Sequence, residues 1–293
     1  MYWLSKKKYI VGLLLPTLIV YTLYIIAPIF IAIYYSFTKY SGIGKAKFAG
    51  LSNYMRLFSD EIVLISLKNT VIILAVNFLL LLVVAFFVAL LLNNRLKYNG
   101  FCKALIFSPA IIAPIIVGII WVYILDPEVG IINGILGAIG LEGWKQQWIG
   151  GRTLSPYSMA VIYFWQQLGY IVTIYIAGLK MLPEEVMEAA MVDGTSAVQK
   201  VLYIIVPMMK TTVSTVVVLV ITGTFKIFEI VQQTTNGGPN HMSETMITYS
   251  YSTTFVNGEY GYGMSLATVT FVISILIVFG YQLVAGRKGE VES

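Results

Sequence analysis

Charged residues are scarce in this chain of 293 residues. Only 11% of the residues are charged and 58% are hydrophobic, whereas an ordinary soluble domain carries about 25% charged residues. A water-soluble fold of this size needs more polar surface, and a disordered chain needs less apolar content. An integral membrane protein is therefore the class that the composition predicts.

Thiol and imidazole side chains are also nearly missing. Cys102 is the only cysteine and His241 the only histidine. One cysteine excludes an intramolecular disulfide and a multi-cysteine metal site, and one histidine excludes a histidine-cluster site. The sequence also lacks a G-x-x-x-x-G-K-[ST] loop and an H-E-x-x-H motif. We therefore expect no metal, no bound cofactor and no catalytic activity in this chain.

Six apolar stretches are long enough to cross a bilayer core, which takes roughly 20 helical residues. In chain order they are Tyr9–Ser36, Leu67–Leu92, Ala104–Leu125, Tyr157–Met181, Thr211–Val231 and Gly263–Ala285. The first stretch is longer than the apolar region of a signal peptide and ends without a small-x-small site, so we expect it to be retained. The pattern predicts an all-α, multi-pass membrane protein.

We expect three parts along the chain. Residues 1–66 hold the first span and an outer segment with a short helix at the membrane interface, 67–285 form a five-helix core, and 286–293 form a tail. Lys and Arg favour the side that holds both termini, most clearly in the connection with Arg95, Lys97 and Lys103, so both termini are predicted to be cytoplasmic. The same bias accounts for the net charge of +5 without a nucleic-acid partner.

The connection between the fourth and fifth spans, residues 182–207, is too regular for a passive loop. Pro183 suits the first turn of a helix, and Gly194 is a natural helix stop. Ser196 and Gln199 have the spacing of a capping box that opens a second helix. The segment is predicted to form a helix-turn-helix across the cytoplasmic face.

The first of these helices has features of a contact site. Ala189 and Ala190 are small enough to let it enter a cleft of another protein, and Glu188 offers a charge for a partner's Arg or Lys. An amphipathic helix resting on lipid is the alternative, although anionic lipid would repel its acidic residues, Glu184, Glu185, Glu188 and Asp193.

These residues resemble a family motif. Glu188-Ala189-Ala190, Gly194 and Ile204-x-Val206-Pro207 are similar to the EAA motif of the inner-membrane permeases of ABC importers, with Val206 in place of Leu. Phe228 to Pro239, which ends in Asn-Gly-Gly-Pro, resembles a segment of the carbohydrate-type permeases, the group of the maltose and glycerol-3-phosphate systems. Glu229 stands there in place of the more usual Asp.

The resemblance implies a type I ABC importer permease fold in the bacterial cytoplasmic membrane. The implied function is the import of a sugar by alternating access, and an oligosaccharide is the favoured solute. Glycerol-3-phosphate or a polyol remains an alternative. The implied partners are a second permease in a heterodimer, a cytoplasmic ATPase dimer that uses ATP and Mg²⁺, an extracellular solute-binding protein, and membrane lipid. The residues implied to couple to the ATPase are Glu188, Ala189, Ala190, Asp193, Gly194 and Pro207.

Candidate solute contacts lie in the fourth and fifth spans. One helix face of the fourth span combines aromatic and amide side chains at positions i, i+3, i+4 and i+7, which are Tyr163, Gln166, Gln167 and Tyr170. Such a face can bind sugar hydroxyls, or it can pack against another helix through its polar groups. By resemblance to the maltose relative, Tyr170, Thr224 and Ile227 fall at solute-contacting positions.

The outer loops carry the remaining candidates. Gly237, Gly238 and Pro239 fit a tight turn, and the resemblance implies that the loops of residues 127–156 and 236–257 dock the binding protein; a turn with no further role is equally consistent. Lys226 and Glu229, at i and i+3, are expected to form a structural ion pair.

Three other classes compete with the importer. A secondary transporter would show an internal repeat and acids near the membrane midplane, and the chain shows neither. An intramembrane enzyme would need a catalytic motif, and a scaffold would not need the 182–207 helices.

Overall fold

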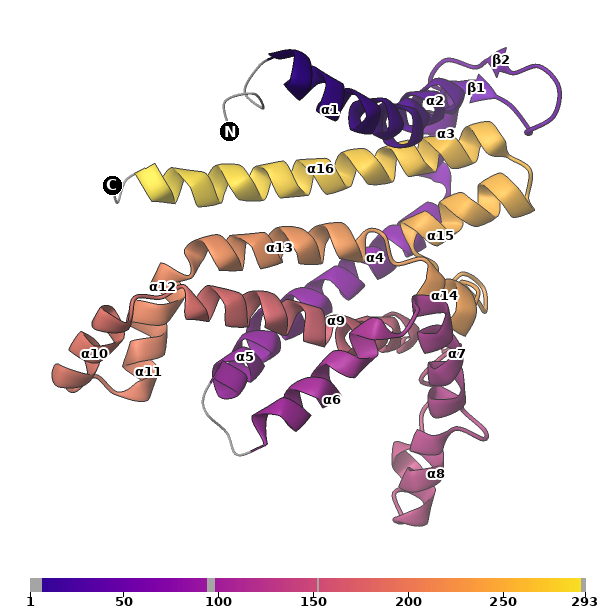
Figure 1. Cartoon of the computed structure of the whole chain (residues 1–293). Helices are drawn as coiled ribbons and strands as arrows, with labels where there is room; N and C mark the ends of the chain where they lie inside the picture. The colour runs from indigo at the N-terminus through magenta and orange to yellow at the C-terminus, as the bar shows by residue number, and fades with distance from the viewer. Residues whose placement is uncertain (1–6, 94–97, 152, 291–293) are drawn as a thin grey trace. The chain divides into compact units, whose positions relative to one another are not determined.

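The computed structural model describes residues 7–93, 98–151 and 153–290, and it consists almost entirely of helices (Figure 1). It divides into two compact units, Met1–Val63 with Tyr249–Val272 and Leu64–Thr248 with Ile273–Ser293. The predicted tail of residues 286–293 falls partly outside the described residues, as do Arg95 and Lys97.

The first unit begins with the predicted first span. Its elements are α1 (Lys7–Tyr21), a π-helical turn (Thr22–Ile26), α2 (Ala27–Ser36), a hairpin of β1 (Thr38–Lys39) and β2 (Lys47–Phe48), and α3 (Ser52–Ser59). The outer segment does contain a short helix, α3, and its place at the membrane interface stays a prediction. The hairpin was not expected, since two-residue strands leave no periodic signal in the sequence.

A polar network joins the two chain segments of this unit. Asp60 accepts hydrogen bonds from the hydroxyls of Tyr249 and Tyr262, each at 2.7 Å. Burial raises the pKa of Asp60, but the hydrogen bonds from Tyr262 and Tyr249 and from the amides of Ile62 and Val63 together outweigh this effect, so the pKa lies below its ordinary value. Arg56 pairs with Glu259, and its guanidinium lies 3.9 Å from the centre of the Tyr262 ring.

The second unit carries the remaining elements. They are α4 (Glu61–Leu79), a π-helical turn (Leu80–Val84), α5 (Ala85–Asn93), α6 (Asn99–Ile111), α7 (Pro114–Leu125), α8 (Ile131–Ala138), a 3-10 turn (Glu142–Trp144), α9 (Ser155–Lys180), α10 (Glu184–Val192), α11 (Ala197–Lys200), a π-helical turn (Val201–Ile205), α12 (Val206–Met208), α13 (Lys210–Thr224) and α14 (Glu229–Thr234). Across the unit boundaries run α4, α15 (Met246–Tyr251, followed by a π-helical turn, Ser252–Val256) and α16 (Tyr260–Glu290).

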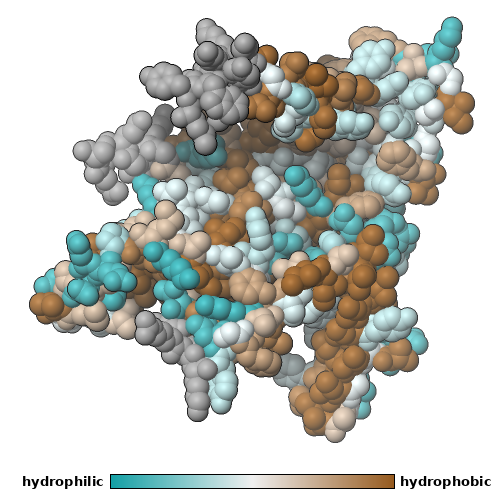
Figure 2. Space-filling model, viewed as in Figure 1, coloured by the Kyte–Doolittle hydropathy of each residue, from teal (hydrophilic) through white to brown (hydrophobic). Residues whose placement is uncertain are grey.

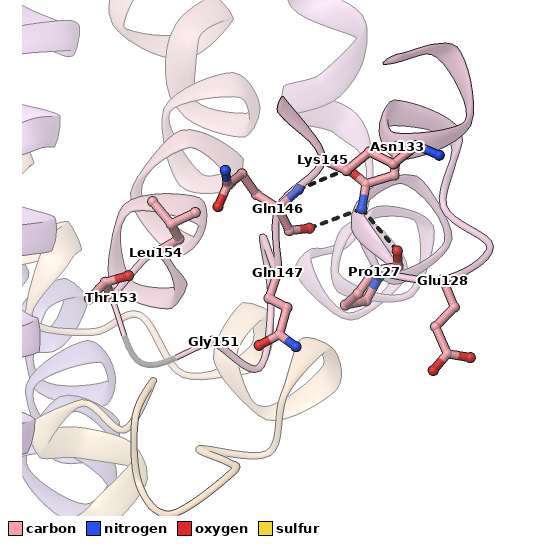
Figure 3. Close-up of a pocket in the computed structure, with 9 residues that line it drawn as sticks. All are labelled: Pro127, Glu128, Asn133, Lys145, Gln146, Gln147, Gly151, Thr153 and Leu154. Carbon is pink, nitrogen blue, oxygen red and sulfur yellow. Dashed lines mark hydrogen bonds between the residues drawn. The ribbon is translucent and has the colours of Figure 1, made fainter. Parts of the chain in front are cut away.

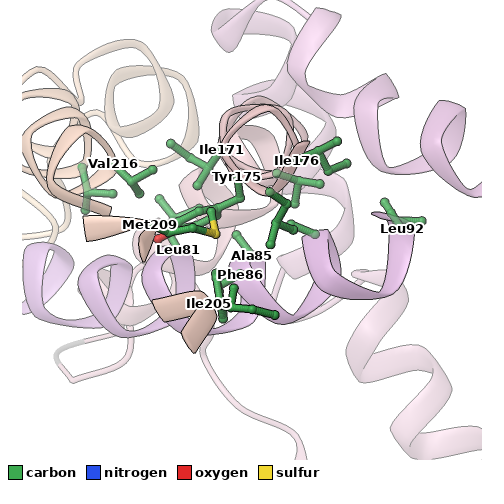
Figure 4. Close-up of a cluster of buried hydrophobic side chains, with 14 residues drawn as sticks. Leu81, Ala85, Phe86, Leu92, Ile171, Tyr175, Ile176, Ile205, Met209 and Val216 are labelled. Carbon is green, nitrogen blue, oxygen red and sulfur yellow. The ribbon is translucent and has the colours of Figure 1, made fainter. Parts of the chain in front are cut away.

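An apolar core fixes α9 at the centre of this unit. Tyr175 and Ile171 of α9 pack with Leu81 and Phe86 from the α4–α5 segment and with Met209 beside α13 (Figure 4). Gly169 of α9 lies against the α6 backbone, where a side chain would overlap Phe107. Small residues at such crossings let membrane helices approach closely.

The third predicted span is bent, and the fifth is shorter than predicted. Four helical segments are long and apolar enough to cross a membrane: Val11–Ser36, Glu61–Asn93, Ser155–Lys180 and Tyr260–Ala285. Within the third span, α6 and α7 meet at 102°. Ala197–Met208 meets α13 at 75°, just before the predicted fifth span of residues 211–231, and α13 ends inside that span at Thr224. Pro114 begins α7 and cannot continue a helix from α6. The described residues thus give six spans when each bent pair is counted once.

Candidate functional site

The segment between α9 and α13 is a helix-turn-helix, as predicted. Pro183 caps α10, which ends with Gly194 in a left-handed conformation at φ 68°. The Thr195 amide donates to the Ala190 carbonyl at 3.1 Å and the Gly194 amide to that of Met191 at 3.2 Å. These two bonds form a Schellman motif, which stops a helix at a defined place.

The second helix is fixed to the first by local bonds. The predicted capping box is confirmed: the Ser196 amide donates to Gln199 Oε1 at 2.9 Å, and the Gln199 amide donates to Ser196 Oγ at 3.3 Å. Thr195 Oγ1 donates to the Ala190 carbonyl and Lys200 Nζ to that of Met187. We call residues 182–207 the coupling loop, and its shape is set by its own residues.

The coupling loop presents most of the residues of the motif on its surface. Glu188, Ala189, Asp193, Gly194 and Pro207 are exposed. Ala190 is only 4% exposed, so its small side chain serves packing inside this chain and does not line the contact surface that the sequence suggested. The exposed apolar tip, Met191 at 63% and Val192 at 88%, was missed, although these two residues directly follow the motif.

A cavity of about 170 Å³ lies between α9 and α13. Its polar lining is Tyr163, Gln167, Tyr170, Thr222 and Lys226. Gly223 lies under the Tyr163 hydroxyl, where any side chain would overlap it. The cavity therefore combines two phenol rings with amide, hydroxyl and ammonium groups, which together can stack on and hydrogen-bond to a sugar.

Three of the predicted solute contacts lie away from this cavity. Gln166 is 3% exposed and donates to the Ile112 carbonyl at 3.1 Å, at the break between α6 and α7. Ile227 is 3% exposed in an apolar cluster with Ile73 and Met159. Thr224 is 2% exposed, and its hydroxyl has no partner among the described residues. Gln166 thus completes a helix break, a use that helix-face spacing does not distinguish from solute contact.

The predicted ion pair between Lys226 and Glu229 is wrong, because the described residues contain no such pair. The i, i+3 spacing brings side chains together only on a continuous helix, and here α13 ends at Thr224 and α14 begins at Glu229. Lys226 lines the cavity instead.

The outer turn around Gly237 is tightly bonded, and we call residues 235–245 the outer loop. Asn69 Nδ2 of α4 donates to the carbonyls of Met242 and Glu244 at 3.0 and 2.9 Å. His241 Nδ1 lies 2.9 Å from the buried Glu244 carboxylate. Gly237, at φ 79°, lies against that carboxylate, where a Cβ atom would overlap it. The loop is therefore a preformed surface.

A second hollow, of about 540 Å³, adjoins the outer loop (Figure 3). It lies in the connection from α7 to α9, and its polar lining includes Glu128, Asn133, Lys145, Gln146 and Gln147. Asn133 Nδ2 donates to the carbonyls of Pro127 and Gln146, both at 2.9 Å, which holds the wall in place. Gly150 places this wall next to Pro239, since a Cβ there would lie 3.6 Å from Pro239 Cδ.

The described residues hold no group of three His, Cys, Asp or Glu side chains that could bind a metal ion. The polar side chains that line the cavity and the second hollow are hydrogen-bonding groups. Asp126 lies near the second hollow. The amides of Val129 and Glu128 donate hydrogen bonds to its carboxylate, which lowers the pKa of this group.

Known proteins resemble the chain over nearly its full length. A probable ABC transporter permease protein of Bacillus subtilis is 30% identical, over 93% of this chain and 94% of that protein. A diacetylchitobiose uptake system permease protein of Streptomyces coelicolor is 26% identical, over 93% of this chain and 82% of that protein. A bacterial alginate ABC transporter, solved with a periplasmic protein bound to an alginate pentasaccharide, superposes with a TM-score of 0.84 at 20% identity, over 97% of this chain and 96% of that one.

The structural match shows that the fold is that of a type I ABC importer permease, an all-α membrane protein. The family model for the inner membrane component of binding-protein-dependent transport systems matches residues 99–289. That stretch contains the cavity, the coupling loop and the outer loop. The chain is therefore a member of the family of binding-protein-dependent transport system inner membrane components, located in the membrane as a transport subunit.

Proposed function

We propose that this chain is one of two permease subunits that carry an oligosaccharide through the membrane by alternating access, powered by a separate ATPase dimer. The observation that supports this most is the coupling loop, a rigid helix pair that is exposed at Glu188 and joined directly to α9. α9 is the helix that carries Tyr163, Gln167 and Tyr170 along the cavity. One helix thus links the motor contact to the solute contact.

In this proposal the coupling loop transmits a displacement from the ATPase to the permease, because its turn between α10 and α11 is fixed. A partner that grips Glu188, Met191 and Val192 displaces α10 and α11 together, since the Schellman motif and the capping box lie between them. The inward-facing and outward-facing states would differ in how tightly the ATPase binds the coupling loop. Such a difference in affinity shifts the equilibrium between two states. ATP and Mg²⁺ belong to the partner, and the proposed grip puts the coupling loop and both termini in the cytoplasm.

The cavity is one wall of the proposed solute path. Tyr163, Gln167, Tyr170 and Lys226 present groups that stack on or hydrogen-bond to sugar hydroxyls, and a second permease supplies the opposite wall. The Streptomyces relative is named for diacetylchitobiose uptake, which supports an oligosaccharide as the solute. Ile227 belongs to the apolar cluster that packs against Tyr163, and Gln166 and Thr224 lie outside the cavity lining.

The outer loop and the second hollow are the proposed docking surface for an extracellular solute-binding protein. Gly237, Gly238 and Pro239 form a preformed turn, and Gly150 places the hollow beside it. A rigid surface costs little ordering entropy when a partner docks. The internal hydrogen bonds of the outer loop would keep it ordered before the binding protein docks.

The test is to co-purify the chain with its ATPase and second permease, reconstitute them, and measure ATP hydrolysis. We expect hydrolysis to rise when the binding protein and its sugar are added together. Uptake is measured with labelled diacetylchitobiose, maltotriose and glycerol-3-phosphate, and uptake of the last alone would replace the oligosaccharide proposal. A rate of ATP hydrolysis that does not change when the binding protein and its sugar are added would contradict the importer role.

Matched variants separate the two parts of the proposal. Tyr170→Ala is expected to lower uptake, while Tyr157→Ala, which removes an equally exposed tyrosine of α9 outside the cavity lining, is expected to leave it unchanged. Equal effects of both variants would remove the cavity from the solute path.

A further inference from the structure

Helix α8 exposes an apolar stripe that the proposed transport function does not use. Ile131, Ile135 and Ile139 are 56%, 56% and 62% exposed. Their spacing of four places them on one side of a helix, and α8 itself contains no charged residue. Among soluble surfaces, such a stripe would be an aggregation hazard unless something apolar covered it.

The opposite side of α8 is fixed to the protein. Asn133 lies two positions from both Ile131 and Ile135, about 200° around the helix from each. It is 4% exposed, and its Oδ1 accepts a hydrogen bond from Trp148 Nε1 at 2.8 Å while its Nδ2 donates to two carbonyls. The bonded amide holds α8 in one orientation, so the isoleucine stripe must face outward.

The stripe continues an apolar surface on α7. Ile115, Ile116, Ile119 and Ile120 of α7 are also exposed, and Figure 2 shows hydrophobic surface running over the region of α7 and α8. α7 turns 102° from α6, and Figure 1 shows α7 and α8 running across the direction of α9 and α13. Asn133 and Leu154 line the same hollow just before α9 begins, so α8 lies level with the end of a membrane span.

The residues that flank the stripe match a membrane interface. Trp144 is 69% exposed just beyond α8, and Tyr123 of α7 is 69% exposed; both residue types collect where headgroups meet acyl chains. Lys145 pairs with Glu142 at 2.6 Å, and Asp126 and Glu128 add negative charge just before α8. These charges leave apolar contact, and not attraction to anionic headgroups, as the driving force.

We infer that α8 is an interfacial helix whose Ile131–Ile135–Ile139 face lies in the outer leaflet of the bilayer. The lipid contact anchors one wall of the second hollow, with Asn133 facing the protein and the isoleucines facing acyl chains. The inference concerns lipid contact alone and stands whatever solute the importer carries.

The test uses the whole importer in lipid nanodiscs, with Cys102→Ser so that a single new cysteine carries an environment-sensitive fluorophore. In Ile135→Cys, we expect blue-shifted emission, a loss of intensity with doxyl-labelled phosphatidylcholine, and little quenching by iodide. Gln147→Cys, in the exposed polar lining of the hollow, is the matched control and should respond to iodide and not to doxyl lipid.

Two outcomes would overturn the inference. Quenching of the Ile135 probe by iodide would place the stripe in water. Quenching by neither agent would place it against protein, such as the second permease. Because Ile135→Cys removes an exposed side chain, folding is checked by comparing ATP hydrolysis with that of the Gln147→Cys protein.

Discussion

The outer loop and the coupling loop solve the same problem, a sharp turn between helices, in opposite ways. The outer loop is held from outside itself: Asn69 of α4 donates to two of its carbonyls, and Gly237 lies on the buried Glu244 carboxylate. The coupling loop is held by its own caps, and its motif residues are mostly exposed. The turn of the outer loop is thus fixed by distant residues, whereas the turn of the coupling loop is fixed by its own residues, although Met187 and Ile205 still pack in the apolar core around α9.

The largest expected difference in stability between the two loops comes from replacing Gly237 and Gly194 with alanine. Gly237→Ala must adopt a positive φ and displace the Glu244 carboxylate, and we expect it to lower the free energy of unfolding by about 2–4 kcal/mol. Gly194→Ala must also adopt a positive φ, but no atom lies within 4 Å of the added Cβ. We therefore expect a smaller loss in the free energy of unfolding, about 1–2 kcal/mol. Thermal unfolding of the purified complex measures both, and equal losses would contradict the comparison.

Two asparagines of α4 give the next largest effect. Asn69→Leu leaves the Met242 and Glu244 carbonyls without this donor, and we expect a loss of about 2 kcal/mol. Asn77 is fully buried on the same helix, and its side-chain amide has no partner among the described residues. Asn77→Leu is therefore expected to be neutral or stabilising in the same thermal assay. A larger loss for Asn77→Leu would show that Asn77 has a partner that the fold alone does not supply.

A smaller effect is expected at the cap inside the coupling loop. Ser196→Ala removes the acceptor for the Gln199 amide, which costs about 1 kcal/mol at a helix start. Since the capping bond lies within the loop, this loss should appear as faster hydrogen exchange of the α11 amides, with little change in the unfolding temperature of the whole complex. Spread of faster exchange into α9 would show that the loop is not an independent piece.

The smallest effect on stability, and a large effect on transport, is expected at Glu188. It is exposed and has no ion pair among the described residues, so Glu188→Gln should leave the unfolding temperature unchanged while lowering uptake per ATP hydrolysed. Glu184→Gln, an exposed acid at the start of the same helix, is the control and should retain uptake. Normal uptake in both variants would contradict the proposed grip.

Local signals explain what the sequence could predict. Pro183, Gly194 and the Ser196–Gln199 box act over a few residues, and the coupling loop followed from them. Pro114 likewise marks a break in the third span, but the 102° angle between α6 and α7 does not follow from it, because the bend also depends on distant contacts such as the hydrogen bond from Gln166, 54 positions away, to the Ile112 carbonyl. Thr224 and Ile227 were placed by resemblance alone, and their burial depends on neighbours that no short pattern contains.

The hydrogen bond from Gln166 to the Ile112 carbonyl has a mechanical consequence. α9 runs without a break from Ser155 to Lys180 and passes directly into the coupling loop, so a shift imposed at one end is carried along a stiff rod. At Gln166 that rod is fastened to the elbow between α6 and α7. Gly169 of α9 also packs against the α6 backbone. A displacement of the coupling loop along α9 would therefore move the α6–α7 bend with it, unless this helix contact and the Gln166 hydrogen bond both break.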